Sequence, residues 1–541
     1  MSMGRVAVLD QPATTYGNLD LLVTEVQRAC ARPVNQLQVA ALLESAGVTQ
    51  AVAMERYQHP DVFALAGVVA RQMRSTARAP VAVRRVAAPP PERRMETIME
   101  YMRGPLALLP IVLLSLTIMV YQGFGQWQTA QVLTMSMAMI GSLLVTGGFV
   151  QAFSRKGSSY LSQGYVRAAQ HIVSKIVVVA LVTMLVTAGL FVALLRIAGW
   201  LSRDNMGLLA VAYIALSVLW LVAGVLFLLK QAHWFGIGIA VGFGLSCLCL
   251  EVLAPTHLAR GAIMLLAATV GMTGVLAVSA LVIRWTLFRE STASPVGNQP
   301  VVLASSAQLL VGLTPYFSYG VLYVAFILSG HVGGWVGALT SAPAPIEAIS
   351  TIEVALTVAL GGYILAGGVA ERTMRRFWQQ VRLDQAETSQ VRPEAFSRTL
   401  QGFFLREHAH FLAALVLCSL CVTASVLIMV SLSSGRGVTL LPWSAETTMV
   451  FLMGQIGYGL MALGMFSCMF MITLSQPWRA VNSVVAGIAV TIVAGPAIGS
   501  ALPYQYATLG VVVGGLVFAL NARARMWSML ENADYFYYAS F

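Results

Sequence analysis

The sequence predicts an all-α polytopic membrane protein with twelve transmembrane helices, arranged as two six-helix lobes. Of its 541 residues, 58% are hydrophobic and only 10% are charged, whereas soluble domains carry about 25% charged residues. From Gly104 onward, twelve apolar runs are long enough to span a bilayer, which requires about 20 residues each. The runs cover residues 104–122, 130–152, 172–197, 207–229, 234–254, 261–286, 306–329, 346–370, 409–432, 447–474, 480–497 and 504–522.

Ahead of these spans, residues 1–74 predict a small helical cytoplasmic module. Four segments place apolar residues at helical spacing, and Asp61 is positioned to start the last of them. The segments are Leu21–Cys30, Gln36–Ser45, Gln50–Tyr57 and Val62–Met73. Residues 75–103 are rich in Ala, Pro and Arg, so we expect a linker that lies against anionic headgroups.

The arginines and lysines predict that both termini lie in the cytoplasm. With the N-terminus inside, all but four of the 33 Lys and Arg residues fall on the cytoplasmic side, as the positive-inside rule requires. The exceptions are Arg196, Arg203, Arg260 and Arg436. The tryptophans agree, since Trp127, Trp200, Trp335 and Trp443 fall at outer span ends, where aromatic belts form.

Twelve spans divide into two sets of six, which predicts parallel repeats related by an axis along the membrane normal. Residues 104–286 form the first lobe, 287–305 a cytoplasmic connector and 306–541 the second lobe. The inner loop 371–408 repeats apolar residues at helical spacing among arginines. This pattern is typical of two amphipathic helices at the inner interface. The alternative, a basic loop that only fixes topology, stays open.

One carboxylate lies deep inside a predicted span. Glu353 falls about two turns into a helix whose midpoint is near Thr357, and it shares one face with Ser350 and Thr357. A charge at the bilayer centre costs at least about 2.5 kcal/mol, so such a residue is a candidate site. A hydrogen bond to a neighbouring helix and a substrate or proton site are both open. Glu347, by contrast, suits the first turn of its helix through the helix dipole.

A tyrosine stripe, Tyr316, Tyr319 and Tyr323, follows Pro315 in the seventh span. Aromatic rings at this spacing can stack on sugar rings along a substrate path, or simply pack against a neighbouring helix. Pro315 removes a backbone hydrogen bond, which predicts a kink or hinge. Gln455, in the glycine-rich tenth span, is a further candidate for the path.

The sequence indicates no enzyme, cofactor or metal site. Apart from His408-x-His410 at an interface, the histidines lack metal-ligand spacing, and there is no phosphate-binding glycine loop. Cys418-x-x-Cys421 lies in an apolar run, where thiols are usually packing residues. The basic charge is spread over loops rather than gathered on one face, which argues against nucleic-acid binding.

The centre of the chain resembles the membrane subunit of Pel-type exopolysaccharide exporters, within the multidrug/oligosaccharidyl-lipid/polysaccharide (MOP) superfamily. The similarity is in Pro315-Tyr-Phe-Ser-Tyr-Gly-Val-Leu-Tyr323, in Gly368-Val-Ala-Glu-Arg-Thr-Met-Arg-Arg-Phe-Trp378 and in the aromatic C-terminal end. The seventh span departs from the Pel-type pattern. Where that pattern has an acidic and a basic residue, this chain has Ser329-Gly-His-Val-Gly-Gly-Trp335, with His331 as the one stand-in.

The resemblance implies a transporter of the bacterial inner membrane that flips or exports a polysaccharide or lipid-linked glycan by alternating access. Its partners would be the glycan, membrane lipids and a cytoplasmic or membrane glycosyltransferase. Glu353 in the cavity would favour a neutral or amino-sugar polymer. Two alternatives stay open: an ion-coupled small-molecule permease of the same superfamily, and a non-transporting scaffold that recruits partners through residues 1–74.

Overall fold

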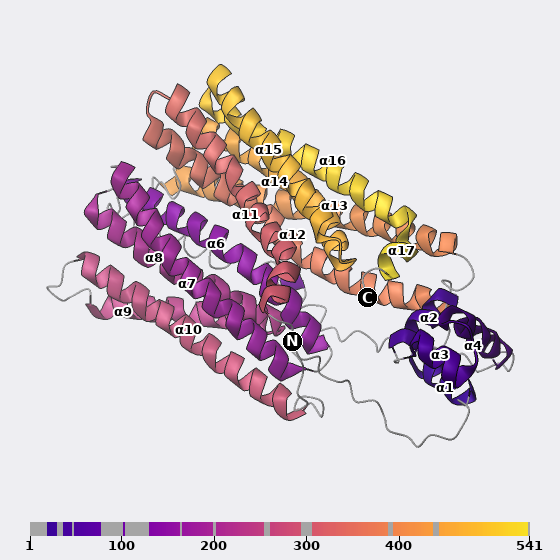
Figure 1. Ribbon diagram of the computed structural model, residues 1–541. Coiled ribbons are helices and arrows are strands. Elements are labelled where there is room, and N and C mark those ends of the chain that lie inside the picture. Colours follow the sequence, from indigo (N-terminus) through magenta and orange to yellow (C-terminus); the bar gives the residue numbers. More distant parts are fainter. Residues whose placement is uncertain are drawn as a thin grey trace. The chain divides into compact units, whose positions relative to one another are not determined.

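The computed structural model describes residues 19–29, 36–45, 48–76, 101–102, 106, 129–162, 165–198, 202–253, 260–293, 306–387, 393–436 and 443–538. The described chain is helical (Figure 1). Its elements are α1 (Leu19–Ala29), α2 (Gln36–Ser45), α3 (Gln50–Tyr57), α4 (Val62–Thr76), α6 (Thr129–Ser162), α7 (Val166–Ala198), α8 (Arg203–Leu228), α9 (Ala232–Leu253), α10 (Arg260–Ala293), α11 (Ser306–Ser341), α12 (Pro345–Glu387), α13 (Pro393–Arg436), α14 (Ala445–Thr473), α15 (Pro477–Ala501), the 3₁₀ helix η1 (Tyr504–Thr508), α16 (Leu509–Glu531) and α17 (Ala533–Tyr538).

The described helices confirm the predicted fold class, an all-α protein that passes the membrane many times. Within the described residues, 11 helices are long and apolar enough to cross a bilayer. They correspond to the second through twelfth predicted spans. The first predicted span, 104–122, lies almost entirely outside the described residues.

The N-terminal module has the four helices that its periodicity predicts. Thr49 caps α3 by accepting from the backbone amide of Val52, and Asp61 starts α4 by accepting from Ala64 at 2.6 Å. Buried aliphatic side chains such as Leu43, Leu65 and Val69 form its core. The described parts of Met1–Glu92 belong to one compact unit with Phe377–Gly402 and Glu531–Asp534, and the membrane helices make up the other.

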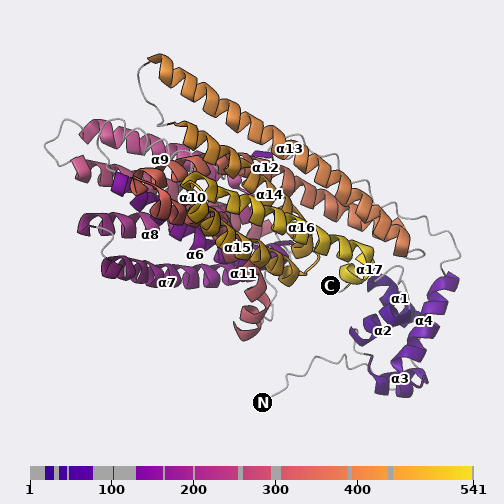
Figure 2. The ribbon, with the colours of Figure 1, turned by 90° about the horizontal axis from the view of Figure 1, so that it is seen from above.

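Within the membrane unit, α6 to α10 pack against one another as a first lobe, and α11, α14, α15 and η1 pack within a second (Figure 1, Figure 2). The lobes meet where α6 lies on α11. Two glycines allow that approach: a Cβ added to Gly320 would stand 2.4 Å from the backbone oxygen of Gly147. Phe149 packs edge-on against Phe317 beside this contact, with ring centroids 4.9 Å apart.

Two helix–helix turns share one geometry and connect corresponding spans of the two lobes. The α8–α9 turn reads Leu229-Lys-Gln231 and the α14–α15 turn reads Leu474-Ser-Gln476. The central residues, Lys230 and Ser475, have φ of 58° and 56°. In each turn the backbone N–H of the glutamine donates to the carbonyl five residues earlier. Gln231 donates to Leu226 and Gln476 to Met471, both at 2.8 Å. These turns join spans four to five and ten to eleven, as a six-plus-six parallel repeat requires.

Several long helices extend beyond the predicted spans. α12 continues through 371–387, and α13 begins at Pro393, so the described parts of the inner loop 371–408 continue membrane helices. α10 likewise runs to Ala293, into the predicted connector, of which 294–305 lies outside the described residues. α11 continues as one helix through Pro315.

Candidate functional site

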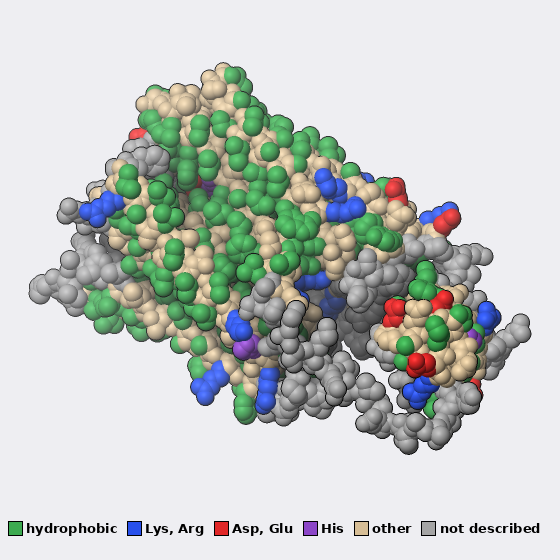
Figure 3. Space-filling model, in the orientation of Figure 1, with side chains coloured by type: hydrophobic (Ala, Val, Ile, Leu, Met, Phe, Trp, Pro, Cys, Tyr) green, Lys and Arg blue, Asp and Glu red, His purple; other side chains and the backbone are tan. Residues whose placement is uncertain are grey.

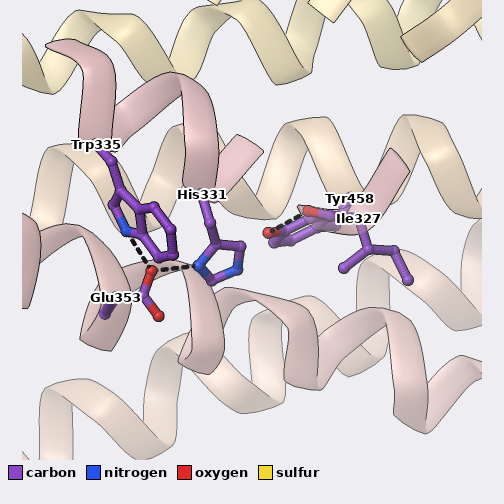
Figure 4. A network of polar contacts seen from close by, with 5 residues as sticks. All are labelled: Ile327, His331, Trp335, Glu353 and Tyr458. Atoms are coloured by element: carbon purple, nitrogen blue, oxygen red, sulfur yellow. Dashed lines mark hydrogen bonds and ion pairs between the residues drawn. The ribbon is translucent and has the colours of Figure 1, made fainter. Parts of the chain in front are cut away.

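Glu353 lies in a buried polar cluster between α11 and α12 (Figure 4). Its Oε1 accepts a hydrogen bond from the Trp335 indole at 2.7 Å and lies 2.8 Å from His331 Nδ1. Glu353 and His331 are each 4% exposed. A carboxylate this deep is stable only with charged or hydrogen-bonding partners, and His331 and Trp335 supply them.

The helix register explains how this cluster forms. His331 and Trp335 are four residues apart on α11, so they lie one above the other on the same face. The chain then turns at 342–344 and returns as α12, which places Glu353 opposite that face. Glu353 is eight residues past the start of α12, about 12 Å along the helix from the α11–α12 turn.

The second carboxylate oxygen, Oε2 of Glu353, is buried and has no hydrogen-bond partner among the described residues. Buried polar atoms are nearly always partnered, so this one has an unused capacity to bind a proton or a donor. In Figure 4 the His331 ring lies between the Glu353 carboxylate and the Tyr458 phenol of α14, whose hydroxyl donates to the Ile327 carbonyl at 3.4 Å. The cluster therefore brings together three helices of the second lobe.

Two tyrosines of the predicted stripe lie in the interior of the same lobe. Tyr319 and Tyr323 are 2% and 8% exposed and stack with ring centroids 5.9 Å apart. The Tyr323 hydroxyl hydrogen-bonds that of Tyr363 on α12, and Tyr363 donates to Met465 Sδ at 2.8 Å. These rings pack against neighbouring helices. Tyr319, Tyr323, His331 and Trp335 are separated by multiples of four residues, so they lie along one ridge of α11.

The third tyrosine of the stripe lies at the contact between the lobes. Arg155 of α6 stands over the Tyr316 ring, with its guanidinium carbon 5.3 Å from the ring centroid. The same arginine donates from Nη2 to the Ser475 hydroxyl at 2.9 Å. Tyr316 therefore belongs to the lobe contact, together with Gly147 and Gly320, rather than to the Glu353 cluster.

The remaining candidates differ in their surroundings. Ser350 and Thr357 are half-buried on the α12 face that Glu353 shares. Gln455 of α14 is 8% exposed, neither of its amide atoms has a partner among the described residues, and it packs against Gly362 of α12. It is a second buried polar group with unfilled hydrogen-bonding capacity. Glu347 is exposed in the first turn of α12.

A second buried carboxylate, Glu407, was not among the sequence candidates. It is 2% exposed, lies 3.0 Å from Arg376 Nη1, and accepts from the Thr373 hydroxyl at 3.3 Å. These contacts tie the first half of α13 to the last third of α12, which is a structural role. Within the part of the chain that the structure describes, no cluster of three or more His, Cys, Asp or Glu residues could hold a metal ion.

His331, Trp335 and Tyr458 are the site residues that sequence reasoning did not select. The available signal was a histidine in mid-helix, four residues before a tryptophan and 22 residues before a buried carboxylate. His331 entered the sequence argument only as the substitute for a charged pair. The structure shows that a pair is present, with its acidic member on the next helix.

The fold is shared with solved transporters. No family model matches the sequence, and no curated protein matches it either. A multidrug resistance MATE family transporter of the MOP superfamily, solved in an outward-facing conformation, superposes with a TM-score of 0.54 at 14% identity, over 80% of this chain and 96% of that one. The D35N mutant of the Vibrio cholerae MATE transporter VcmN gives 0.57 at 14% identity, over 82% and 99%. At this identity the likeness establishes the two-lobe MATE-type fold alone.

Proposed function

We propose that this protein is a membrane transporter that flips or exports a cell-surface polysaccharide or a lipid-linked oligosaccharide across the bacterial inner membrane. The MATE-type fold supports transport by alternating access, and the Pel-type similarity around Pro315–Tyr323 and Gly368–Trp378 supports a glycan as cargo. The observation that carries the proposal is the buried Glu353–His331 pair with an unpartnered carboxylate oxygen. Ionisable groups this deep in a membrane span are usually functional.

Glu353 is the residue on which the transport cycle depends in this proposal. Oε1 is held by His331 and Trp335, so Oε2 is the atom free to take a proton or a donor from the cargo. Protonation of Glu353 would remove the negative charge that faces His331 and weaken that contact. Since His331 lies on α11 and Glu353 on α12, the change would loosen the two helices that form the outer hairpin of the second lobe.

The test is export by a strain that lacks the chromosomal gene and carries plasmid-borne variants. Deletion should abolish the surface polysaccharide, and the wild-type gene should restore it. Glu353→Gln should restore less than about a tenth of it, because Gln keeps the shape but cannot take the proton. Export is measured as surface polysaccharide per cell, normalised to membrane abundance of the protein.

Glu347→Gln is the matched control, because Glu347 lies six residues earlier on α12 but is exposed. It should restore export fully. Normal export by Glu353→Gln at normal abundance would contradict the role of Glu353, and an unchanged polysaccharide in the deletion strain would contradict the glycan as cargo.

A second candidate is an ion-coupled permease for small molecules, which the fold of a multidrug resistance transporter favours. It predicts that the deletion strain keeps its polysaccharide but becomes more sensitive to toxic compounds, and that Glu353→Gln fails to restore resistance. A non-transporting scaffold predicts that the Glu353 variant is silent in both assays. The two phenotypes are measured on the same strains, so the three functions are separable.

A further inference from the structure

The first lobe contains an apolar groove of about 430 Å³ that the Glu353 cluster does not use. It lies among α7, α8 and α10, with Leu161 at the end of α6 also in its wall, and this wall is almost entirely aliphatic. Val178 of α7, Leu221 of α8 and Ile283 of α10 are among the residues that line it. No aromatic, aspartate or glutamate side chain lines it, and Gln170 and Ser174 are its polar residues. A wall of this kind suits a flexible hydrocarbon chain better than a rigid polar ligand.

The groove opens toward the side of α7 that carries exposed aliphatic residues. Val178, in its wall, is 58% exposed, and Val182, one turn further, is 57% exposed. Large apolar side chains with this exposure in a membrane span face lipid tails. A chain can therefore enter from the bilayer.

Three basic residues adjoin the wall of the groove: Arg167 near the start of α7, Lys230 in the turn after α8 and Arg284 in the last third of α10. Arg167 precedes Gln170 and Ser174 by three and seven residues, so it lies on the same α7 face, closer to the α6–α7 turn. Lys230 directly follows the wall residue Leu229, and Arg284 is three residues before Leu287 on α10. All three basic side chains are exposed. Figure 3 shows Lys, Arg and His side chains at the lower edge of the membrane unit, around the ends of α7 and α10.

We propose that this groove binds one acyl chain of an anionic phospholipid, with the lipid phosphate held by Arg167, Lys230 and Arg284. In the orientation that the arginine distribution predicts, these residues face the cytoplasmic leaflet. Juxtamembrane Lys and Arg attract anionic headgroups electrostatically. The site is independent of the cargo and lies in the lobe opposite to Glu353, so it would hold a structural or regulatory lipid.

The test uses the full-length protein in detergent with either phosphatidylglycerol or phosphatidylcholine added at equal concentration. Retained lipid is counted by native mass spectrometry, and the midpoint of thermal unfolding is recorded in parallel. The wild type should retain phosphatidylglycerol at least about fivefold more often than phosphatidylcholine, and phosphatidylglycerol should raise its midpoint more.

Two pairs of variants locate the site. Val178→Trp fills the groove, whereas Val179→Trp adds the same ring at a residue of equal exposure, 57%, that does not line it. Arg167→Ala removes a basic residue at the groove, whereas Arg196→Ala removes an exposed arginine at the other end of α7. Val178→Trp and Arg167→Ala should each lose most of the phosphatidylglycerol preference, and their controls should keep it.

Equal retention of both lipids by the wild type would overturn the proposal. So would equal loss in Val178→Trp and Val179→Trp, or loss in Arg196→Ala rather than Arg167→Ala. Folding of Val178→Trp is judged by elution as a single peak from size-exclusion chromatography. If this variant does not fold, the lipid preferences of Arg167→Ala and Lys230→Ala are compared with that of Arg196→Ala, and this comparison decides. Failure of export in the Glu353 experiment would leave this result unaffected.

Discussion

Among the described residues, the polar side chains that are fully buried in the first lobe are hydroxyls, whereas those of the second lobe include carboxylates, an imidazole and an amide. The described residues of α6 to α10 bury Thr134, Ser142, Thr146, Ser217, Ser279 and Thr286. Those of α11 to α16 bury Glu353, His331, Glu407 and Gln455 beside serines and threonines. A hydroxyl can bond to the preceding turn of its own helix, as Thr146 does to Ser142 at 2.7 Å. A carboxylate needs a partner on another helix.

This difference exists although the two lobes share one turn structure. The turns at Lys230 and Ser475 both read Leu-x-Gln, their central residues have nearly the same φ, and their backbone hydrogen bonds match. The described helices α6 to α10 therefore pack without a buried carboxylate, whereas α12 carries Glu353 inside its lobe. Departures from an apolar core are expected at functional sites.

The largest expected effect comes from placing a carboxylate in the first lobe. Ser279 is fully buried in the middle of α10, near the buried residues Val275 and Val282. Ser279→Glu should destabilise the protein by about 3 kcal/mol or more, because the charge has no partner there. Ser279→Ala is the control and should be nearly neutral. Yield and thermal midpoint in detergent are measured. A normal midpoint for Ser279→Glu would mean that either lobe tolerates buried charge.

A smaller effect is expected at the contact between the lobes. Gly320→Ala places a methyl against the Gly147 backbone, which neither helix can avoid without moving, so we expect a loss of about 1–3 kcal/mol. Gly312→Ala, on the same helix, meets no atom within 4 Å and should be neutral or slightly stabilising. The two midpoints are compared under identical conditions. Equal midpoints would show that α6 and α11 are not in close contact in the detergent-solubilised protein.

The smallest effect distinguishes the two matching turns. A residue with φ near 57° is strained unless it is glycine. Lys230→Gly should therefore stabilise the protein by about 0.5–1 kcal/mol in detergent without added lipid. Ser475→Gly should gain less, because it also loses the hydrogen bond from Arg155.

In an Arg155→Ala background, that difference between the two glycine variants should disappear. The measurement is a double-mutant cycle on thermal midpoints. A difference of the same size with and without Arg155 would show that the contact between Arg155 and Ser475 contributes nothing to stability.

Most of the fold was predictable because a bilayer imposes length and hydropathy on each span. α2 and α3 have the predicted bounds, and the described spans are in the predicted order. The length of α12 after residue 370 and that of α13 before residue 409 were underestimated for a physical reason. Arginines after Ala370 end the hydropathy signal, but they do not end a helix, because arginine is a good helix former and the apolar stripe continues.

The site was predictable only in part. Glu353 could be selected because its position within one apolar segment can be counted from the sequence, and the energetic cost of a buried charge depends on that position. Its partners depend on how α11 is rotated against α12, and spacing within either helix does not encode that rotation. From the sequence, Trp335 was therefore interpreted as an anchor at the membrane interface. In the structure its indole donates a hydrogen bond to Glu353. Whether Pro315 acts as a hinge and whether Gln455 lies on the substrate path stay predictions.

The hydrogen bond from Trp335 also gives the protein an internal optical reporter. Indole emission responds to the charge of a group bonded to its nitrogen and to a nearby imidazole. A variant that keeps Trp335 and replaces the other nine of its ten tryptophans by phenylalanine would emit from the Glu353 cluster alone. Its spectrum would report changes in the surroundings of this cluster, without a bound dye and without knowledge of the cargo.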